Sequence, residues 1–153
     1  MSQQINKLKS TVNFYSLEKT EDIYLCICRL VRKLYKENKK IIIIENDNKL
    51  ESIDKLLWSF EQNTFLPHKI HSSDGDIDTP ILLISSQYIN KLQLFDNYSE
   101  IINNCEIPLI ENNTYTNIHE LVSDSEEHKI ICRNKYTQYM NNNFDVTHRK
   151  YNE

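Results

Sequence analysis

The sequence of 153 residues predicts an α/β fold, in which helices cover both faces of a mostly parallel central sheet. Segments with strand character alternate along the chain with segments of helical periodicity, which is the order that a layered α/β domain requires. Two strand segments, Ile41–Ile44 and Pro80–Ile84, are unbroken apolar runs. Such runs are typical of strands buried on both faces of a parallel sheet. Together these features predict a three-layer α/β/α domain.

The first half of the chain supplies a strand, two helices and the first apolar run. Residues Val12–Leu17 read as a strand, and Thr20 is placed to cap the helix that follows. One face of that helix is apolar, through Ile23, Ile27, Leu30 and Leu34. A second helix is expected over Asn48–Phe60, after the Ile41–Ile44 run. Its apolar stripe consists of Leu50, Ile53, Leu56, Leu57 and Phe60.

The second half supplies further strands and a last helix. Residues 72–76 form an acidic segment with the only glycine of the chain, which predicts a surface turn. Two shorter strands are expected after the Pro80–Ile84 run, at Ser99–Asn103 and Ile118–Val122. The last helix is expected from Asp124 to about Asn142, with Ser123 and Glu126 as a capping box at its start. We expect one domain over residues 11–153, preceded by a short tail over residues 1–10.

Composition excludes several classes of protein. The net charge of −4 argues against a general DNA-coating protein, which would be basic. No stretch approaches the roughly 20 apolar residues that cross a bilayer, and the first residues lack an apolar signal core, so we expect a cytoplasmic protein without membrane contact.

The four cysteines match no common zinc spacing and are expected as reduced, partly buried thiols. Asparagine replaces glycine where a left-handed backbone is needed.

Cofactor binding and catalysis find little support. A phosphate-binding loop needs several glycines at fixed spacing, whereas this chain has one glycine, in an acidic segment. The first strand ends at the segment Leu17-Glu18-Lys19-Thr20, whose Glu18 would place a negative charge where a phosphate sits. The five histidines share no helical metal spacing, and we expect His68 to make a loop or capping hydrogen bond. We therefore expect no cofactor, no metal and no catalytic residue, and favour a binding protein.

Two surfaces stand out as candidate binding sites. Trp58 points away from the apolar stripe of its helix and precedes the apolar loop Phe65–His68, so Trp58, Phe65 and Pro67 together predict an exposed surface for a protein partner. The alternative is that Trp58 packs beneath this loop as part of the core.

The last helix carries the second candidate site. Lys129, Arg133, Tyr136 and Met140 share a narrow face, Lys135 lies on its flank, and the opposite face is expected to meet the core through Ile131, Cys132 and Tyr139. The basic face predicts a site for an acidic peptide with an apolar tip, because arginine binds carboxylates while an aromatic ring and methionine shelter a side chain. The alternative is a solvated polar face with snorkelling side chains.

The chain resembles the chi subunit family of bacterial DNA polymerase III over residues 11–148. The matching segments are Asn13–Tyr15, Leu56–Phe60, Phe65–His68, Pro80–Leu83, Arg133–Tyr139 and Phe144. The block around Trp58 followed by the helix with Arg133, Tyr136 and Tyr139 is specific when both occur in this order. The chain departs from the family pattern in its N-terminal tail, in a longer and less basic segment Gln87–Tyr98, and in Met140, where relatives are often basic.

This resemblance implies a Rossmann-like α/β/α domain without enzymatic activity. It implies that the last helix binds the acidic C-terminal tail of single-stranded-DNA-binding protein, which ends in Pro-Phe, through Lys129, Arg133 and Tyr136, with Lys135 and Met140 beside them. It also implies that Trp58, Phe65 and Pro67 bind the psi subunit, which connects chi to the clamp loader, or a helicase in its place. Contact with DNA would be indirect. The competing hypotheses are a small nucleotide-dependent enzyme on the same fold and an interaction module outside replication.

Overall fold

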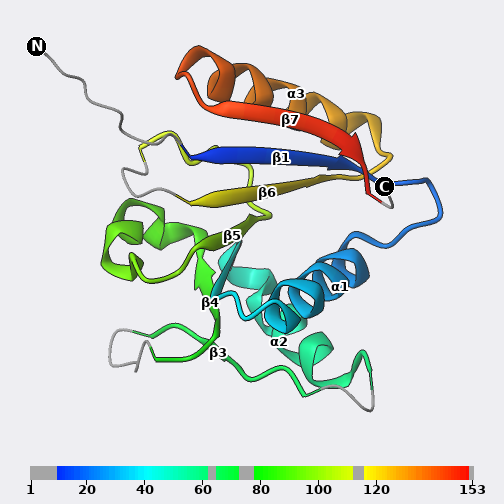
Figure 1. Ribbon diagram of the computed structural model, residues 1–153. Coiled ribbons are helices and arrows are strands. Elements are labelled where there is room, and N and C mark those ends of the chain that lie inside the picture. Colours follow the sequence, from blue (N-terminus) through cyan, green and yellow to red (C-terminus); the bar gives the residue numbers. More distant parts are fainter. Residues whose placement is uncertain (1–9, 62–64, 73–77, 112–115, 152–153) are drawn as a thin grey trace, which may run out of the picture.

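The computed structural model describes residues 10–61, 65–72, 78–111 and 116–151, which form a layered α/β structure (Figure 1). The elements in chain order are β1 (Thr11–Ser16), α1 (Ile23–Lys36), β2 (Ile41–Glu45), the 3-10 helix η1 (Asp47–Lys49), α2 (Leu50–Ser59), β3 (His68–Ile70), β4 (Ile81–Ser85), the 3-10 segment η2 (Ser86–Phe95), β5 (Glu100–Asn103), β6 (Asn117–Val122), α3 (Glu126–Asn141) and β7 (Asp145–Lys150). The turn expected around Gly75 and residues 1–9 of the tail expected over residues 1–10 lie outside the described residues.

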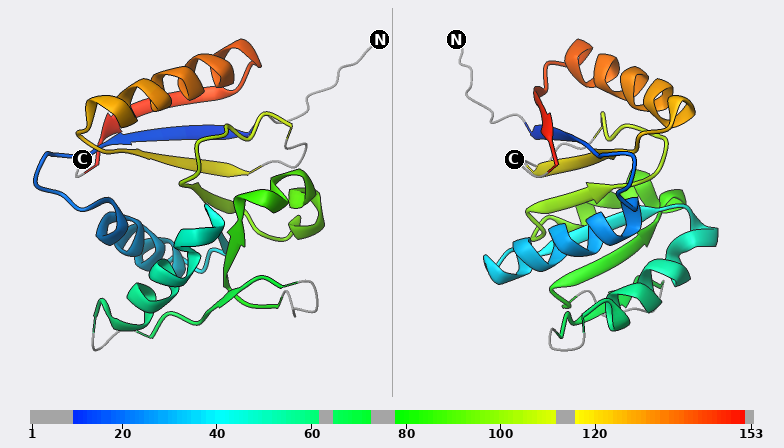
Figure 2. Two further views of the ribbon diagram at one scale, coloured as in Figure 1. Left: turned by 180° about the vertical axis from the view of Figure 1, so that it is seen from behind. Right: turned by 90° about the vertical axis from the view of Figure 1, so that its right-hand side faces the viewer.

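The seven strands form one sheet in the order β3-β4-β2-β5-β6-β1-β7, and every neighbouring pair is parallel. Helices α1 and α2 cover one face of this sheet, and α3 covers the other, over β6, β1 and β7 (Figure 2). The predicted three-layer α/β/α fold is therefore confirmed. The sheet is parallel throughout its described strands, where the sequence predicted a mostly parallel one.

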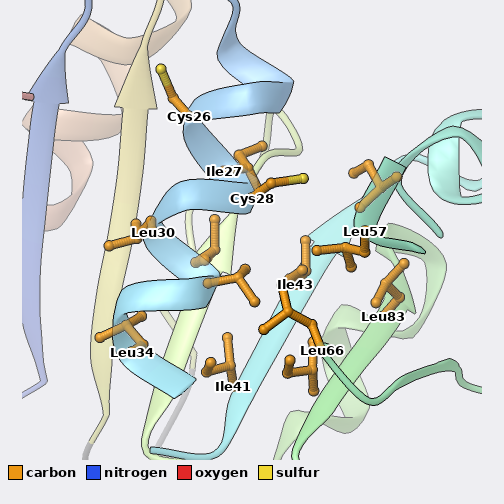
Figure 3. Close-up of a cluster of buried hydrophobic side chains, with 14 of the residues drawn as sticks. Cys26, Ile27, Cys28, Leu30, Leu34, Ile41, Ile43, Leu57, Leu66 and Leu83 are labelled. Carbon is orange, nitrogen blue, oxygen red and sulfur yellow. The ribbon is translucent and has the colours of Figure 1, made fainter. Parts of the chain in front are cut away.

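Strand β2 shows why the apolar runs were informative. Its isoleucines alternate between the two faces of the sheet: Ile41 and Ile43 belong to the buried cluster on the side of α1 and α2, and Ile42 and Ile44 to the cluster on the side of α3 and η2. All four are buried. The α1 and α2 side of the core, with Ile27, Leu57 and Leu83, is drawn in Figure 3. The predicted apolar faces of both helices are confirmed as the faces that cover this cluster.

Both predicted helix caps were wrong by a few residues. The cap of α1 is Asp22, whose carboxylate accepts hydrogen bonds from the N–H groups of residues 24 and 25 at 2.8 and 3.2 Å. The cap of α3 is Ser125, whose hydroxyl accepts from the N–H of His128 at 3.3 Å. Ser123 instead donates its backbone N–H to His128 Nδ1 at 3.0 Å. Several Ser, Thr and Asp residues precede each helix, and sequence alone does not rank them.

Two strands and one helical segment were not predicted. Strand β3 is only three residues long, and β7 is a charged edge strand without the apolar alternation that marks a strand. The Gln87–Tyr98 segment folds largely as η2, which is kinked at Tyr88 and Lys91. Asn38 and Asn143 have positive φ angles of 64°, as expected of asparagine after a helix.

The cysteines are free thiols, as expected, but they are buried more deeply than the expected partial burial. All four are free and buried. Burial raises the pKa of Cys28 to about 12 and that of Cys132 to about 11. None of the helices in the described part of the chain is long and apolar enough to cross a bilayer.

Candidate functional site

An open pocket of about 570 Å³ lies between α3 and the carboxyl ends of the strands beneath it. Its lining comes from α3 and three strands, and consists of Phe14, Ser16, Val122, Lys129, Cys132, Arg133, Tyr136, Thr137 and His148. Three residues that the sequence placed on one helical face, Lys129, Arg133 and Tyr136, therefore border one pocket. We call it the α3 pocket.

The floor of the α3 pocket is aromatic and apolar. The rings of Phe14 and Tyr136 lie 5.2 Å apart between centroids, and the ring of Tyr139 lies 6.0 Å from that of Phe14. Cys132 is buried beside them. Phe14 reaches this floor because alternate residues of β1, Val12 and Phe14, face the α3 layer. An apolar side chain of a ligand would be sheltered from water here.

The rim of the α3 pocket carries two cations, of which Lys129 is ion-paired within the protein and Arg133 is not paired with any described residue. Lys129 Nζ lies 2.8 Å from the carboxylate of Asp124 and 3.8 Å from that of Glu126. The hydrogen bond with Asp124 raises the pKa of Lys129, and the same bond lowers the pKa of Asp124. Arg133 is exposed and has no ion-pair partner within the described ranges. Arg133 is therefore the rim cation that is most available to an acidic ligand.

Lys135 does not belong to the α3 pocket, which corrects the placement expected from sequence. Its side chain is 3% exposed and turns into the core, where Nζ contacts the carboxylate of Glu120 and lies 2.8 Å from the carbonyl oxygen of Cys105. The same carboxylate accepts hydrogen bonds from Asn103 Nδ2 at 2.9 Å and from the Tyr139 hydroxyl at 2.7 Å. Burial raises the pKa of Glu120, and Lys135 opposes that shift. The role of Lys135 in this structure is structural.

Met140 is exposed, as expected, but it lies beyond the pocket lining, which ends on α3 at Thr137. Conversely, the pocket includes Ser16 and His148, which the sequence did not indicate. The two are hydrogen-bonded to each other across β1 and β7. No sequence signal could pair them, because β7 was not recognised as a strand.

The second surface is formed by α2 and the loop before β3. Trp58 is 52% exposed and Phe65 is 68% exposed, with ring centroids 5.7 Å apart. The Trp58 ring also packs against His68, at 4.2 Å between centroids, while Pro67 is half-buried. The alternative of a fully buried Trp58 is thus not the observed arrangement. We call Trp58, Phe65 and Pro67 the Trp58 surface.

His68 holds the Trp58 surface in place. It is buried, and its two ring nitrogens face oxygen acceptors: Nδ1 lies 2.6 Å from the Leu66 carbonyl, and Nε2 lies 3.1 Å from the Asp54 carboxylate. The loop is thereby tied to α2, which agrees with the hydrogen-bonding role expected for His68. Helices α2 and α3 lie at opposite ends of the molecule, so the Trp58 surface and the α3 pocket are separate (Figures 1 and 2).

Other sites receive little support from the geometry. Where a nucleotide phosphate would approach the β1–α1 turn, the Glu21 carboxylate accepts a hydrogen bond from the Glu18 N–H at 2.6 Å, and Asp22 caps α1. The start of α1 is therefore occupied by the protein's own carboxylates. Among the described residues, no group of three His, Cys, Asp or Glu side chains is arranged to hold a metal ion.

Comparison with known proteins agrees with these features. Residues 10–147 match the family model described as DNA polymerase III chi subunit, HolC. The chain is also similar to the DNA polymerase III subunit chi of Haemophilus influenzae, with 26% identity over 138 residues that cover 86% of this chain and 90% of the relative. The chain therefore belongs to the chi subunit family of DNA polymerase III, a family of accessory subunits of a replicative polymerase.

Proposed function

We propose that the α3 pocket binds the acidic C-terminal tail of single-stranded-DNA-binding protein. The observation that carries this proposal is the combination of an aromatic floor, made by Phe14 and Tyr136, with the exposed cation of Arg133 at the rim, which forms no ion pair with the described residues. A peptide that ends in Pro-Phe after acidic residues matches both features. Its terminal ring would rest on the floor while Arg133 takes a carboxylate through paired hydrogen bonds.

The contributions of the two rim cations should differ. Lys129 already holds the carboxylates of Asp124 and Glu126, so an incoming peptide has to compete with them. Arg133 meets no such competitor among the described residues. Arg133 is therefore the primary contact and Lys129 a secondary one. Lys135 is excluded from the site by its burial.

Titration calorimetry with the tail peptide tests the assignment. Arg133→Ala should weaken binding roughly ten- to a hundredfold, because a hydrogen bond to a charged group contributes about 1.5–3 kcal/mol. Lys129→Ala should weaken it less. Asn134→Ala, on the exposed side of the same helix turn, is the matched control and should leave the affinity for the peptide unchanged. Unchanged affinity for a folded Arg133→Ala protein would remove Arg133 from the site.

We further propose that the Trp58 surface binds a second protein, the psi subunit or a helicase in its place. Half-exposed Trp58 and exposed Phe65 form an apolar patch that is fixed in shape by His68. Rigid aromatic side chains of this kind are common hot spots of protein interfaces. Because this surface and the α3 pocket lie at opposite ends of the molecule, both partners fit at once. The protein would then connect the clamp loader to protein-coated single-stranded DNA.

This proposal assigns no catalytic role to the chain. Thermal shift with ATP, GTP and NAD tests the alternative of a nucleotide-dependent enzyme, since a ligand at ~100 times its Kd stabilises a protein by roughly 2.7 kcal/mol. We expect no shift with any of the three. Pull-down with the organism's own single-stranded-DNA-binding protein distinguishes a replication role from an interaction outside replication.

A further inference from the structure

Strand β7 forms an edge of the sheet, and no described strand pairs with its outer side. The N–H groups of Asp145 and Tyr151 donate to the carbonyl oxygens of Ser10 and Ser16, at 3.4 and 3.0 Å. Successive residues of a strand direct their backbone groups to opposite sides. The odd-numbered residues of β7 therefore face β1, and the even-numbered ones direct their N–H and C=O groups outward. The outward residues are Val146, His148 and Lys150.

The carboxyl half of β7 carries cations on both faces of the sheet. His148 lines the α3 pocket, and Lys150 shares that face by alternation. Arg149 lies on the opposite face, with its guanidinium carbon 5.8 Å from the centroid of the Tyr15 ring. An extended segment beside β7 also alternates its side chains between the two faces. Consecutive acidic residues of such a segment would meet Lys150 on one face and Arg149 on the other.

We propose that an acidic extended peptide pairs with the outer edge of β7 as an eighth strand while its end occupies the α3 pocket. This inference rests on the proposed function of the pocket and extends the site to the backbone of β7. His148 belongs to both places, because its side chain lines the pocket and its backbone faces the open edge. A peptide that leaves the pocket would therefore meet backbone donors and acceptors that no described strand pairs.

Charge selects the peptide that can pair in this way. Cations on an edge strand generally disfavour pairing with a second apolar or basic strand. An acidic segment would instead be attracted electrostatically to these cations. The edge would therefore pair with acidic peptides in preference to apolar or basic ones. Main-chain hydrogen bonds would then supply affinity that depends little on the peptide's side chains. Asp145, at the amino end of β7, confines the pairing to the carboxyl half.

Amide hydrogen exchange followed by nuclear magnetic resonance tests the pairing on the full chain. The probe is a synthetic peptide of Asp and Glu residues that ends in Pro-Phe. On binding, exchange should slow several-fold at His148 and Lys150, whose N–H groups gain partners in the carboxyl half of β7. Exchange at Thr147 and Arg149, which face β1, should change little, so the change should alternate along the strand.

A pair of variants at one position supplies the matched control. Lys150→Ala and Lys150→Pro both remove the charge, but only proline also removes the outward N–H, and an edge strand tolerates proline there. Lys150→Pro should bind the probe peptide more weakly than Lys150→Ala by roughly two- to tenfold, the net effect of one hydrogen bond. Equal affinities of the two folded variants would contradict pairing at this position.

The outcomes separate this inference from the proposed function. If the peptide binds and Arg133→Ala weakens binding as expected while exchange at His148 and Lys150 is unchanged, the pocket stands and the edge pairing is wrong. If these amides are already protected in the free protein, by a second copy or by another segment of the chain, the edge is occupied and the inference fails. If the peptide does not bind at all, both proposals fail.

Discussion

Replacing Lys135 by methionine should strongly destabilise the protein without entering the peptide site. Methionine keeps most of the length of the side chain and removes the ammonium group. In the native structure that ammonium pairs with the Glu120 carboxylate, with side-chain exposures of 3% and 1%. It also lies 2.8 Å from the carbonyl oxygen of Cys105. The substitution leaves a buried carboxylate without its cation.

The size of the expected loss in folding stability follows from the burial of this ion pair. Removing one partner of a buried ion pair costs about 3–5 kcal/mol. The Glu120 carboxylate keeps its hydrogen bonds from Asn103 and Tyr139, so we expect a loss near the lower limit, about 3 kcal/mol. For a domain of this size that corresponds to a fall in Tm of about 6–12 °C. Such a loss is a large part of the 5–15 kcal/mol typical of whole domains.

The loss should also depend on pH. Burial already raises the pKa of Glu120, and removing Lys135 takes away the neighbour that lowers it. A carboxyl whose pKa is raised in the folded state favours folding when it is protonated. Its favourable effect is present below the unfolded pKa of about 4.3 and is lost as the pH rises through the folded pKa. The deficit of Lys135→Met should therefore grow from acidic to neutral pH.

Urea unfolding at several pH values, followed by circular dichroism, measures this effect. Adding Glu120→Gln to Lys135→Met should restore part of the stability, because the uncompensated charge is then gone. Arg133→Ala is the control, since substitutions of exposed side chains usually change stability by less than about 0.5 kcal/mol. An unchanged urea midpoint for Lys135→Met, together with lost binding of the tail peptide, would refute the structural assignment of Lys135.

Three further predictions concern the Trp58 surface, DNA and the thiols. Trp58→Ala should cost roughly 1–2 kcal/mol of stability, less than the 3–5 kcal/mol of a fully buried aromatic, because Trp58 is 52% exposed; partner binding in a pull-down should fall by about 2 kcal/mol or more. A large drop in urea midpoint with intact partner binding would contradict this. Bare single-stranded DNA should not bind with submicromolar affinity in fluorescence anisotropy at ~150 mM salt, because the net charge is −4 and the cationic region is small. Thiol reagents should label the native protein slowly at neutral pH and the urea-unfolded protein completely, because burial raises the pKa of Cys28 to about 12 and that of Cys132 to about 11; fast labelling of native Cys132 would show that the α3 pocket exposes its sulfur.

The elements that the sequence predicted correctly are those with a strong local pattern. The isoleucine run of β2 is buried on both faces, and the apolar faces of α1 and α2 cover the core as periodicity indicated. The elements that were missed lack such a pattern. Strand β7 is mostly charged and exposed because it lies at the edge of the sheet, and its partner β1 is more than a hundred residues away in the chain. Pairing over that distance leaves no periodic signature.

The candidate site shows the same division. Helical spacing correctly placed Lys129, Arg133 and Tyr136 beside one another. Spacing also placed Lys135 on the flank of that face. It could not tell that the Lys135 cation is buried whereas the Arg133 cation is exposed. This difference in burial arises because the Glu120 carboxylate, on β6 beneath α3, forms an ion pair with the Lys135 ammonium in the core. No property of the helix sequence alone reports which carboxylate its face will cover.

Sequence by itself determined the layered α/β class, the apolar faces of the helices, the exposed position of Trp58 and the resemblance to a family. These properties depend on residues that are close in the chain or on the pattern as a whole. Only the tertiary structure decided that Phe14, Tyr136 and His148 surround one pocket, that Lys135 is buried, and that β7 is an edge of the sheet formed by the described strands. Those properties depend on the order of strands in the sheet and on which helix covers which strand, and both are set by packing between segments that are distant in sequence.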